Sequence, residues 1–210
     1  MALCACACSH SPRKLGQQSP GSVARLAGVQ LCKPNQCNLA EPVPPDEPYR
    51  YLSPPPGGAV ARKLRSARVV IVLDDAGRNS ATYLNSEEAG PQISVYFSTG
   101  CLTGAPRARV TISATAVASP GRETADGHVV GNAYRVSAVA DLGVAPSVTT
   151  PVEVQLRVPP PISANGRYLV EVQNGPEWTA VPTVVAGTDV VQANLPRLGA
   201  VVAVVQLGNR

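Results

Sequence analysis

Short runs of Val, Ile, Thr and Tyr, separated by Gly, Pro, Asn and Asp, fill the sequence from Ala67 to its end. The segment VEVQLRV at residues 152–158 alternates strictly, with apolar residues at the even positions and Glu153, Gln155 and Arg157 at the odd ones. Successive side chains of a strand point to opposite faces, so this pattern predicts a strand with one face in a core and the other in water. Because no run of helical period lies between such segments, the sequence predicts an all-β fold.

The turns between these segments favour an antiparallel arrangement. In RYLVEVQNGPEWTAV two strands flank Asn174 and Gly175, residue types that tolerate positive φ at a hairpin. About nine strands at short intervals are typical of an immunoglobulin-like antiparallel β-sandwich. We favour one continuous sandwich over residues 67–208, with two halves, 67–145 and 151–208, as the alternative. The expected strands are residues 68–73, 93–98, 107–117, 132–140, 152–158, 167–173, 178–185, 189–195 and 199–206.

The C-terminal part has a Trp after a turn, a Val-rich return strand and the segment LPRLG before the last strand. In this pattern it is similar to the terminal hairpin modules of secreted bacterial immunoglobulin-like proteins. The resemblance implies the fold and carries no functional residues. The last apolar run, GAVVAVVQLG, is about half as long as a membrane helix and is expected to be a central strand.

The net charge of +4 belongs to the N-terminal part of the chain. Residues 1–66 have eight Lys and Arg against three Asp and Glu, whereas residues 67–210 have ten against eleven. A mildly basic tail is typical of a solvated tether, and the nearly neutral remainder has no basic stripe interleaved with aromatic residues. We therefore expect no nucleic-acid partner.

Residues 9–66 have no sustained period of 2 or 3.6, and stretches such as EPVPPDEPYRYLSPPPGG are rich in Pro, Gly and Ser. Such a segment buries too little apolar surface to offset the entropy that it would lose on ordering, and its prolines favour an extended chain. The composition predicts a disordered, Pro-rich tether in which Tyr49 and Tyr51 are free for a partner.

Cysteine or histidine stands at every second position near the start: Cys4, Cys6, Cys8 and His10. In an extended chain these side chains would share one side, so a metal-binding protein is one hypothesis, although the spacing does not match zinc signatures. Another interpretation is that this N-terminus is an artefact of start-codon choice and is not translated.

The segment LCAC within this cluster resembles the lipobox of bacterial lipoproteins, with Leu3 at −3, Ala5 at −1 and Cys6 as the acylated cysteine. The resemblance implies cleavage before Cys6, a lipid anchor in the membrane and a periplasmic or surface-exposed location at the bacterial cell envelope. Residues 1–8 would then be the remnant of a signal peptide and lipobox. Because five uncharged residues are too few for a signal peptide, we expect the true start to lie upstream of Met1.

Cleavage and acylation would leave four thiols: Cys8, Cys32, Cys37 and Cys101. The segment CKPNQC encloses four residues, which suits a small disulfide-closed turn, so we expect a disulfide between Cys32 and Cys37. The alternative is that both cysteines are reduced in a cytosolic protein.

Two short segments contain side chains suited to catalysis or metal binding. Asp126 and His128 could lie on one side of an extended segment, so a small periplasmic hydrolase is an alternative function. However, ADG is also a common turn, and no GxSxG, HExxH or phosphate-loop motif is present. Asp74, Asp75 and Asn79 offer oxygen ligands without the spacing of a calcium loop. We expect no catalytic residue, metal site or cofactor.

Aromatic rings that stack on sugars are the remaining candidate for a ligand surface. Trp178, with Tyr168 on the preceding strand, is the place where the sequence suggests such a platform; the alternative is that Trp178 anchors the core. The expected function is that of an exported, lipid-anchored cell-envelope protein. Its sandwich would be a non-catalytic binding or structural module that recognises a protein or glycan partner through loops or sheet edges.

Overall fold

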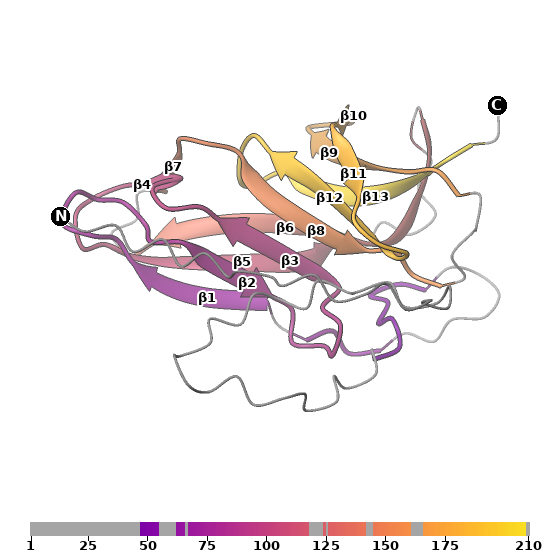
Figure 1. The fold of residues 1–210 in the computed structure, drawn as a ribbon, viewed down its shortest axis with the longest axis horizontal. Helices are drawn as coiled ribbons and strands as arrows, with labels where there is room; N and C mark the ends of the chain where they lie inside the picture. Colours follow the sequence, from indigo (N-terminus) through magenta and orange to yellow (C-terminus); the bar gives the residue numbers. More distant parts are fainter. Residues whose placement is uncertain are drawn as a thin grey trace, which may run out of the picture. The chain divides into compact units, whose positions relative to one another are not determined.

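The computed structural model describes residues 47–54, 62–65, 67–117, 124, 126–141, 145–160 and 166–208. All of them belong to one compact unit, Asn38–Arg210. Every regular element in this described part is a strand, and its strand pairings are antiparallel, which confirms the prediction of an all-β antiparallel fold (Figure 1). Within these ranges, no helix is long and apolar enough to cross a membrane.

Six strands form the larger sheet, in the order β1-β5-β6-β13-β9-β10. β6 is 14 residues long and pairs with β5 on one side and β13 on the other. The bounds are β1 Ala67–Val72, β5 Arg109–Val117, β6 Gly127–Ala140, β13 Val201–Leu207, β9 Tyr168–Asn174 and β10 Glu177–Val181.

Five strands form the smaller sheet, in the order β11-β12-β8-β3-β2. The alternating segment lies in β8, where its apolar side chains are buried as the pattern predicts. The bounds are β11 Thr183–Val185, β12 Val190–Leu195, β8 Val152–Arg157, β3 Ile93–Phe97 and β2 Thr82–Asn85. β4 (Leu102–Thr103) and β7 (Ser147–Val148) form a separate two-stranded pair.

The main hydrophobic core lies between the two large sheets. It contains inward-facing side chains of both, among them Ile112 and Val136 from the larger sheet and Phe97 and Leu156 from the smaller. These side chains are almost completely buried. Burial of apolar surface between two layers is the main force that holds a sandwich together.

A second, smaller cluster lies on the opposite face of the larger sheet. In β13 the core takes Val202 and Val204, while Val201, Ala203 and Val205 belong to the second cluster. Both faces of this strand are therefore buried, which explains why its sequence is apolar throughout and agrees with its position inside the sheet.

Residues 178–185, expected as one strand, form two strands in different sheets. β10 pairs with β9, whereas β11 pairs with β12. Pro182 lies between them and lacks the N–H group that a continuous ladder needs. The Thr183 hydroxyl supports the corner, because it accepts a hydrogen bond from the Val170 N–H at 2.8 Å and donates one to the Val181 carbonyl at 2.8 Å.

Other strands depart from the sequence-based bounds. β2, β4 and β7 were not expected, and β6 begins at Gly127 rather than at residue 132. β4 and β7 are two residues long, which is too short for a periodic pattern. β2 is a four-residue edge strand with one buried apolar residue, Leu84, so its alternation is short.

Both large sheets combine strands from either side of the Pro-rich join at residues 146–151. β8 pairs with β3 in the smaller sheet, and β13 pairs with β6 in the larger one. Two half-sized domains would each need separate sheets, so this pairing describes one sandwich.

Residues 47–54 and 62–65, which we expected within the tether, pack against the sandwich; we call them the docked segment. Tyr49 and Tyr51 are 7% and 8% exposed, with ring centroids 4.8 Å apart. The Tyr49 hydroxyl accepts a hydrogen bond from the Asn132 N–H at 3.0 Å. These tyrosines are therefore part of the packed structure and are not free.

Side-chain amides of the sandwich satisfy the backbone of the docked segment. Gln92 binds both backbone groups of Arg50, accepting from its N–H at 2.8 Å and donating to its carbonyl at 3.0 Å. Asn132 accepts from the Leu52 N–H at 2.9 Å and donates to the Arg50 carbonyl at 2.7 Å. These bonds replace those of a sheet ladder, so the segment can be buried without unpaired backbone groups at these positions.

Candidate functional site

Five cysteines and one histidine with a predicted role lie outside the described residues. They are the lipidation residue Cys6, the expected disulfide partners Cys32 and Cys37, and the remaining cluster residues Cys4, Cys8 and His10. Their roles stay predictions. Cys101, in contrast, is described: its thiol is buried and unbridged, and burial raises its pKa.

Asp126 and His128 lie at the start of β6. The backbone of His128 pairs with Gln206 of β13, while the carboxyl group of Asp126 contributes to the electrostatic surroundings of Glu171, whose Oε2 is buried without a hydrogen-bond partner among the described residues. Glu171 is almost completely buried and accepts a hydrogen bond from the Thr124 hydroxyl at 3.1 Å. Burial raises the pKa of Glu171, and the neighbouring Asp126 charge adds to this, whereas the Thr124 hydrogen bond opposes it.

Trp178 and Tyr168 lie on opposite faces of the larger sheet. Trp178 is the register partner of Gln173, which is an odd number of residues from Tyr168 along β9, and an odd offset changes the face. Trp178 packs against the second cluster, and Tyr168 packs against the main core. The two rings therefore do not form one sugar-stacking platform.

The segment LDDAGRNS forms a turn in which the side chains of Asp74, Asp75 and Asn79 bond to other groups of the chain. Asp74 accepts hydrogen bonds from two backbone N–H groups at 2.8 and 2.9 Å, and Asp75 pairs with Arg107 at 2.6 Å. Asn79 is buried and accepts from the Leu102 N–H at 2.8 Å. Across the described ranges, no group of three or more His, Cys, Asp or Glu could hold a metal ion.

The outer face of the smaller sheet presents a pair of tyrosines. Tyr83 of β2 and Tyr96 of β3 are register partners, with ring centroids 4.6 Å apart and ring planes at 31°. Tyr83 is 52% exposed and Tyr96 is half-buried. Alternation along these strands sends Leu84 and Val95 into the core, so both tyrosines point away from it.

Polar side chains continue this surface across the sheet in two adjacent rows. Gln155 lies in one row and donates a hydrogen bond from Nε2 to Oε1 of Glu153 in the other, at 3.1 Å. Neither row contains Lys, Arg or His. We call the two rows the tyrosine face: Tyr83, Tyr96, Glu153 and Asn194 in the first, and Asn85, Ser94, Gln155 and Gln192 in the second.

A surface of this composition can bind a ligand that has both apolar and hydroxyl-bearing sides. The ring faces offer stacking area at a small cost in conformational entropy, and the amides can both donate and accept hydrogen bonds. Sequence reasoning missed the surface because TYLN was not recognised as a strand. Two signals could have found it. Tyr83, Leu84 and Asn85 alternate between outward and buried positions, and Tyr96 stands between two buried apolar residues, Val95 and Phe97.

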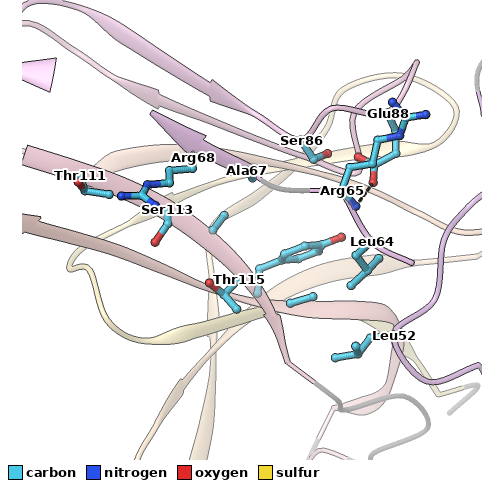
Figure 2. Close-up of a pocket in the computed structure, with 13 residues that line it drawn as sticks. Leu52, Leu64, Arg65, Ala67, Arg68, Ser86, Glu88, Thr111, Ser113 and Thr115 are labelled. Carbon is cyan, nitrogen blue, oxygen red and sulfur yellow. Dashed lines mark hydrogen bonds between the residues drawn. The ribbon is translucent and has the colours of Figure 1, made fainter. Parts of the chain in front are cut away.

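A pocket of about 580 Å³ lies where the docked segment meets the larger sheet. Leu52 and Leu64 of the docked segment line it together with Ala114 and Thr115 of β5 and the ring of Tyr134 of β6 (Figure 2). The pocket is on a different sheet from the tyrosine face. Its lining is largely apolar, with hydroxyl groups among the β5 side chains.

Glu88, in the loop between β2 and β3, brings a carboxyl group into this lining (Figure 2). The residue is 5% exposed, and its Oε1 accepts a hydrogen bond from the Arg65 N–H at 3.2 Å. Its Oε2 is buried and has no hydrogen-bond donor among the described residues. Burial raises the pKa of Tyr134, and the charge of Glu88 contributes to this rise, so the carboxylate lies close to the phenol.

The sequence matches no protein-family model. A comparison with curated proteins gives no match either.

Proposed function

We propose that the chain is an exported, lipid-anchored protein of the bacterial cell envelope whose β-sandwich is a non-catalytic glycan-binding module. In this proposal the tyrosine face is the binding surface, and Cys6 carries the anchor. The observation that carries the binding proposal is the register pair of the exposed Tyr83 and the half-buried Tyr96, beside amide side chains on the same face.

The chemistry of the face favours a neutral polysaccharide. Sugar rings combine C–H faces, which stack on aromatic rings, with hydroxyl groups, which bond to amides and carboxylates. Two adjacent rows that run across four strands suit a chain of several sugar units better than a single unit. Because the face has Glu153 as its one acid and no cationic side chain, it offers no partner to the carboxylates or phosphates of an acidic polymer.

The anchoring part rests on the lipobox-like segment from Leu3 to Cys6 and on the Pro-rich composition that follows it. A tether of this kind would hold the sandwich away from the membrane surface, within reach of envelope polysaccharides. A lipid anchor also restricts a weak binder to the surface where its ligand is concentrated.

Affinity electrophoresis of the full chain through gels that contain neutral polysaccharides tests the binding proposal. The panel is a β-glucan, a galactomannan and dextran, with alginate as the anionic comparison. We expect retardation by at least one neutral polymer and none by alginate. Tyr83→Ala and Tyr96→Ala should each weaken binding about tenfold, because each removes a stacking ring.

Two further variants separate stacking from folding. Tyr83→Phe retains the ring and should bind within about twofold of the original chain. Val139→Ala alters a similarly exposed residue on the other sheet and should change nothing. Equal retardation of Tyr83→Ala and the original chain would rule out the tyrosine face as the site.

The mass of the N-terminal peptide tests the anchor. The gene, with its upstream DNA, is expressed in its own host, and the membrane fraction is digested and analysed by mass spectrometry. We expect a peptide that begins at Cys6 and carries added acyl mass. An unmodified peptide that begins at Met1 with free thiols contradicts the anchor, whatever the glycan measurement gives.

A further inference from the structure

The pocket beside the docked segment contains a charge that its own surroundings leave incompletely compensated. Glu88 is 5% exposed, yet the single hydrogen bond from the described residues reaches Oε1, from the Arg65 N–H. Oε2 is buried without a donor in that part of the chain. An unpaired carboxylate oxygen is costly to bury, so a donor that arrives from outside would stabilise the folded state on binding.

The neighbouring cations do not bond to this oxygen. The guanidinium group of Arg65 is engaged elsewhere, with Glu47 at 3.1 Å and with the carbonyl of Glu87 at 3.4 Å. Arg68 also lines the pocket, but its side chain is exposed and extends beside Thr111 and Ser113 rather than Glu88 (Figure 2).

The remaining lining determines what can accompany the donor. Leu52, Leu64, Ala114 and the Tyr134 ring present apolar surface, and the volume of about 580 Å³ exceeds what a single water molecule needs. A ligand with a short alkyl body would therefore displace water from apolar walls, while its polar end reaches the carboxylate.

We propose that this pocket binds a primary alkylammonium ligand whose alkyl chain packs against Leu52 and Leu64, and that the Glu88 side chain turns on binding so that its Oε2 accepts a hydrogen bond from the ammonium group. An ammonium group compensates both the missing hydrogen bond and the buried negative charge, whereas a hydroxyl group supplies the hydrogen bond alone. The site is independent of the tyrosine face and of its proposed glycan.

Three probes of equal length test the proposal on the full chain: butylammonium chloride, 1-butanol and sodium butyrate. Binding is followed in two-dimensional NMR spectra of ¹⁵N-labelled protein at constant ionic strength. The Arg65 N–H, which bonds to Glu88, is the reporter. We expect butylammonium to bind at least about tenfold more tightly than butanol, as a charge-assisted hydrogen bond predicts, and butyrate to leave the Arg65 resonance unchanged.

The adjacent acid provides a matched control. Glu88→Gln keeps an oxygen for the Arg65 N–H and changes the net charge by one, and it should weaken butylammonium binding about tenfold. Glu87→Gln changes the net charge equally at an exposed position and should leave the affinity unchanged. Equal losses in both variants would mean general attraction to an acidic loop and would overturn the proposal. Equal affinities for butylammonium and butanol in the unaltered chain would also overturn it, without any variant.

Discussion

At the scale of single residues, Glu171 of β9 is unusual because it is an acidic residue that is almost completely buried, with 1% of the residue exposed. Thr124 donates to one carboxyl oxygen, while Asp126 adds a second acid beside it. Its pKa is raised, so the folded chain holds this proton to a higher pH than the unfolded chain does. Stability is therefore lost as the pH rises from the unfolded pKa of Glu, about 4.3, through the raised folded value.

Glu171→Gln should remove this loss. A glutamine can still accept from Thr124, and its amide can donate to Asp126, so the variant should be more stable than the original chain at pH 7.5, by about 1 kcal/mol. The two should converge at about pH 3, where the glutamate is protonated in both states. Urea unfolding at the two pH values measures the difference, with Glu177→Gln at an exposed position of β10 as the control. The same difference at both pH values would contradict the assignment.

At the scale of elements, β6 shifts its register against β13 between Val202 and Val204. On the β6 side, Gly131 has a φ of +74° at this irregularity, and its neighbour Asn132 binds the docked segment. A Cβ on Gly131 would lie 2.5 Å from the Tyr49 hydroxyl oxygen. The irregular strand thus provides both the space and the hydrogen-bonding groups that hold the docked segment.

Gly131→Ala should strain the backbone and also displace Tyr49. Gly175, with a φ of +65°, is the matched control, because a Cβ there meets nothing within 4 Å. Strain alone should cost about 1–3 kcal/mol in either variant, and Gly131→Ala should cost more. Hydrogen exchange of the Asn132 N–H, which donates to Tyr49, should accelerate in Gly131→Ala and stay slow in Gly175→Ala. Equal effects of the two variants would show that a Cβ at residue 131 does not displace the Tyr49 hydroxyl group.

At the scale of the whole molecule, the sandwich includes residues that precede its first strand. Arg157 donates hydrogen bonds to the carbonyls of Glu47 at 2.9 Å and Gly90 at 2.7 Å, and its guanidinium lies 5.5 Å from the centre of the Tyr49 ring. Arg157, Gln92 and Asn132 each have hydrogen-bond partners in the docked segment. The packed structure therefore begins before β1.

Removal of the docked segment should destabilise the sandwich more than removal of the residues before it. A chain that begins at residue 47 should unfold at nearly the same urea concentration as the full chain, since residues 1–46 are expected to be a tether. A chain that begins at residue 66 leaves several buried polar groups without partners and should lose about 3 kcal/mol or more. Equal midpoints for the two truncated chains would mean that the docked segment contributes nothing to stability.

The positions of the main strands and the all-β class could be read from the sequence, because the two-residue period of a strand is a local property. The strictly alternating residues 152–158 predicted β8, and the run at the C-terminus predicted the strand buried on both faces, β13. The change of sheet at Pro182 also has a local cause, because proline lacks the N–H group that a continuous ladder needs.

The surfaces available to ligands depended on contacts between residues far apart in the chain. Trp178 and Tyr168 share a hairpin, but the register of β9 with β10 sends them to opposite faces, whereas the pairing of β2 with β3 brings Tyr83 and Tyr96 together. The buried Tyr49 hydroxyl accepts a hydrogen bond from the backbone N–H of Asn132, which is 83 positions away in the sequence. Local alternation in the sequence indicates most of the segments that become strands, because it depends only on neighbouring residues. Which side chains share a face follows from strand pairing, because register and long-range hydrogen bonds arise only when the strands come together.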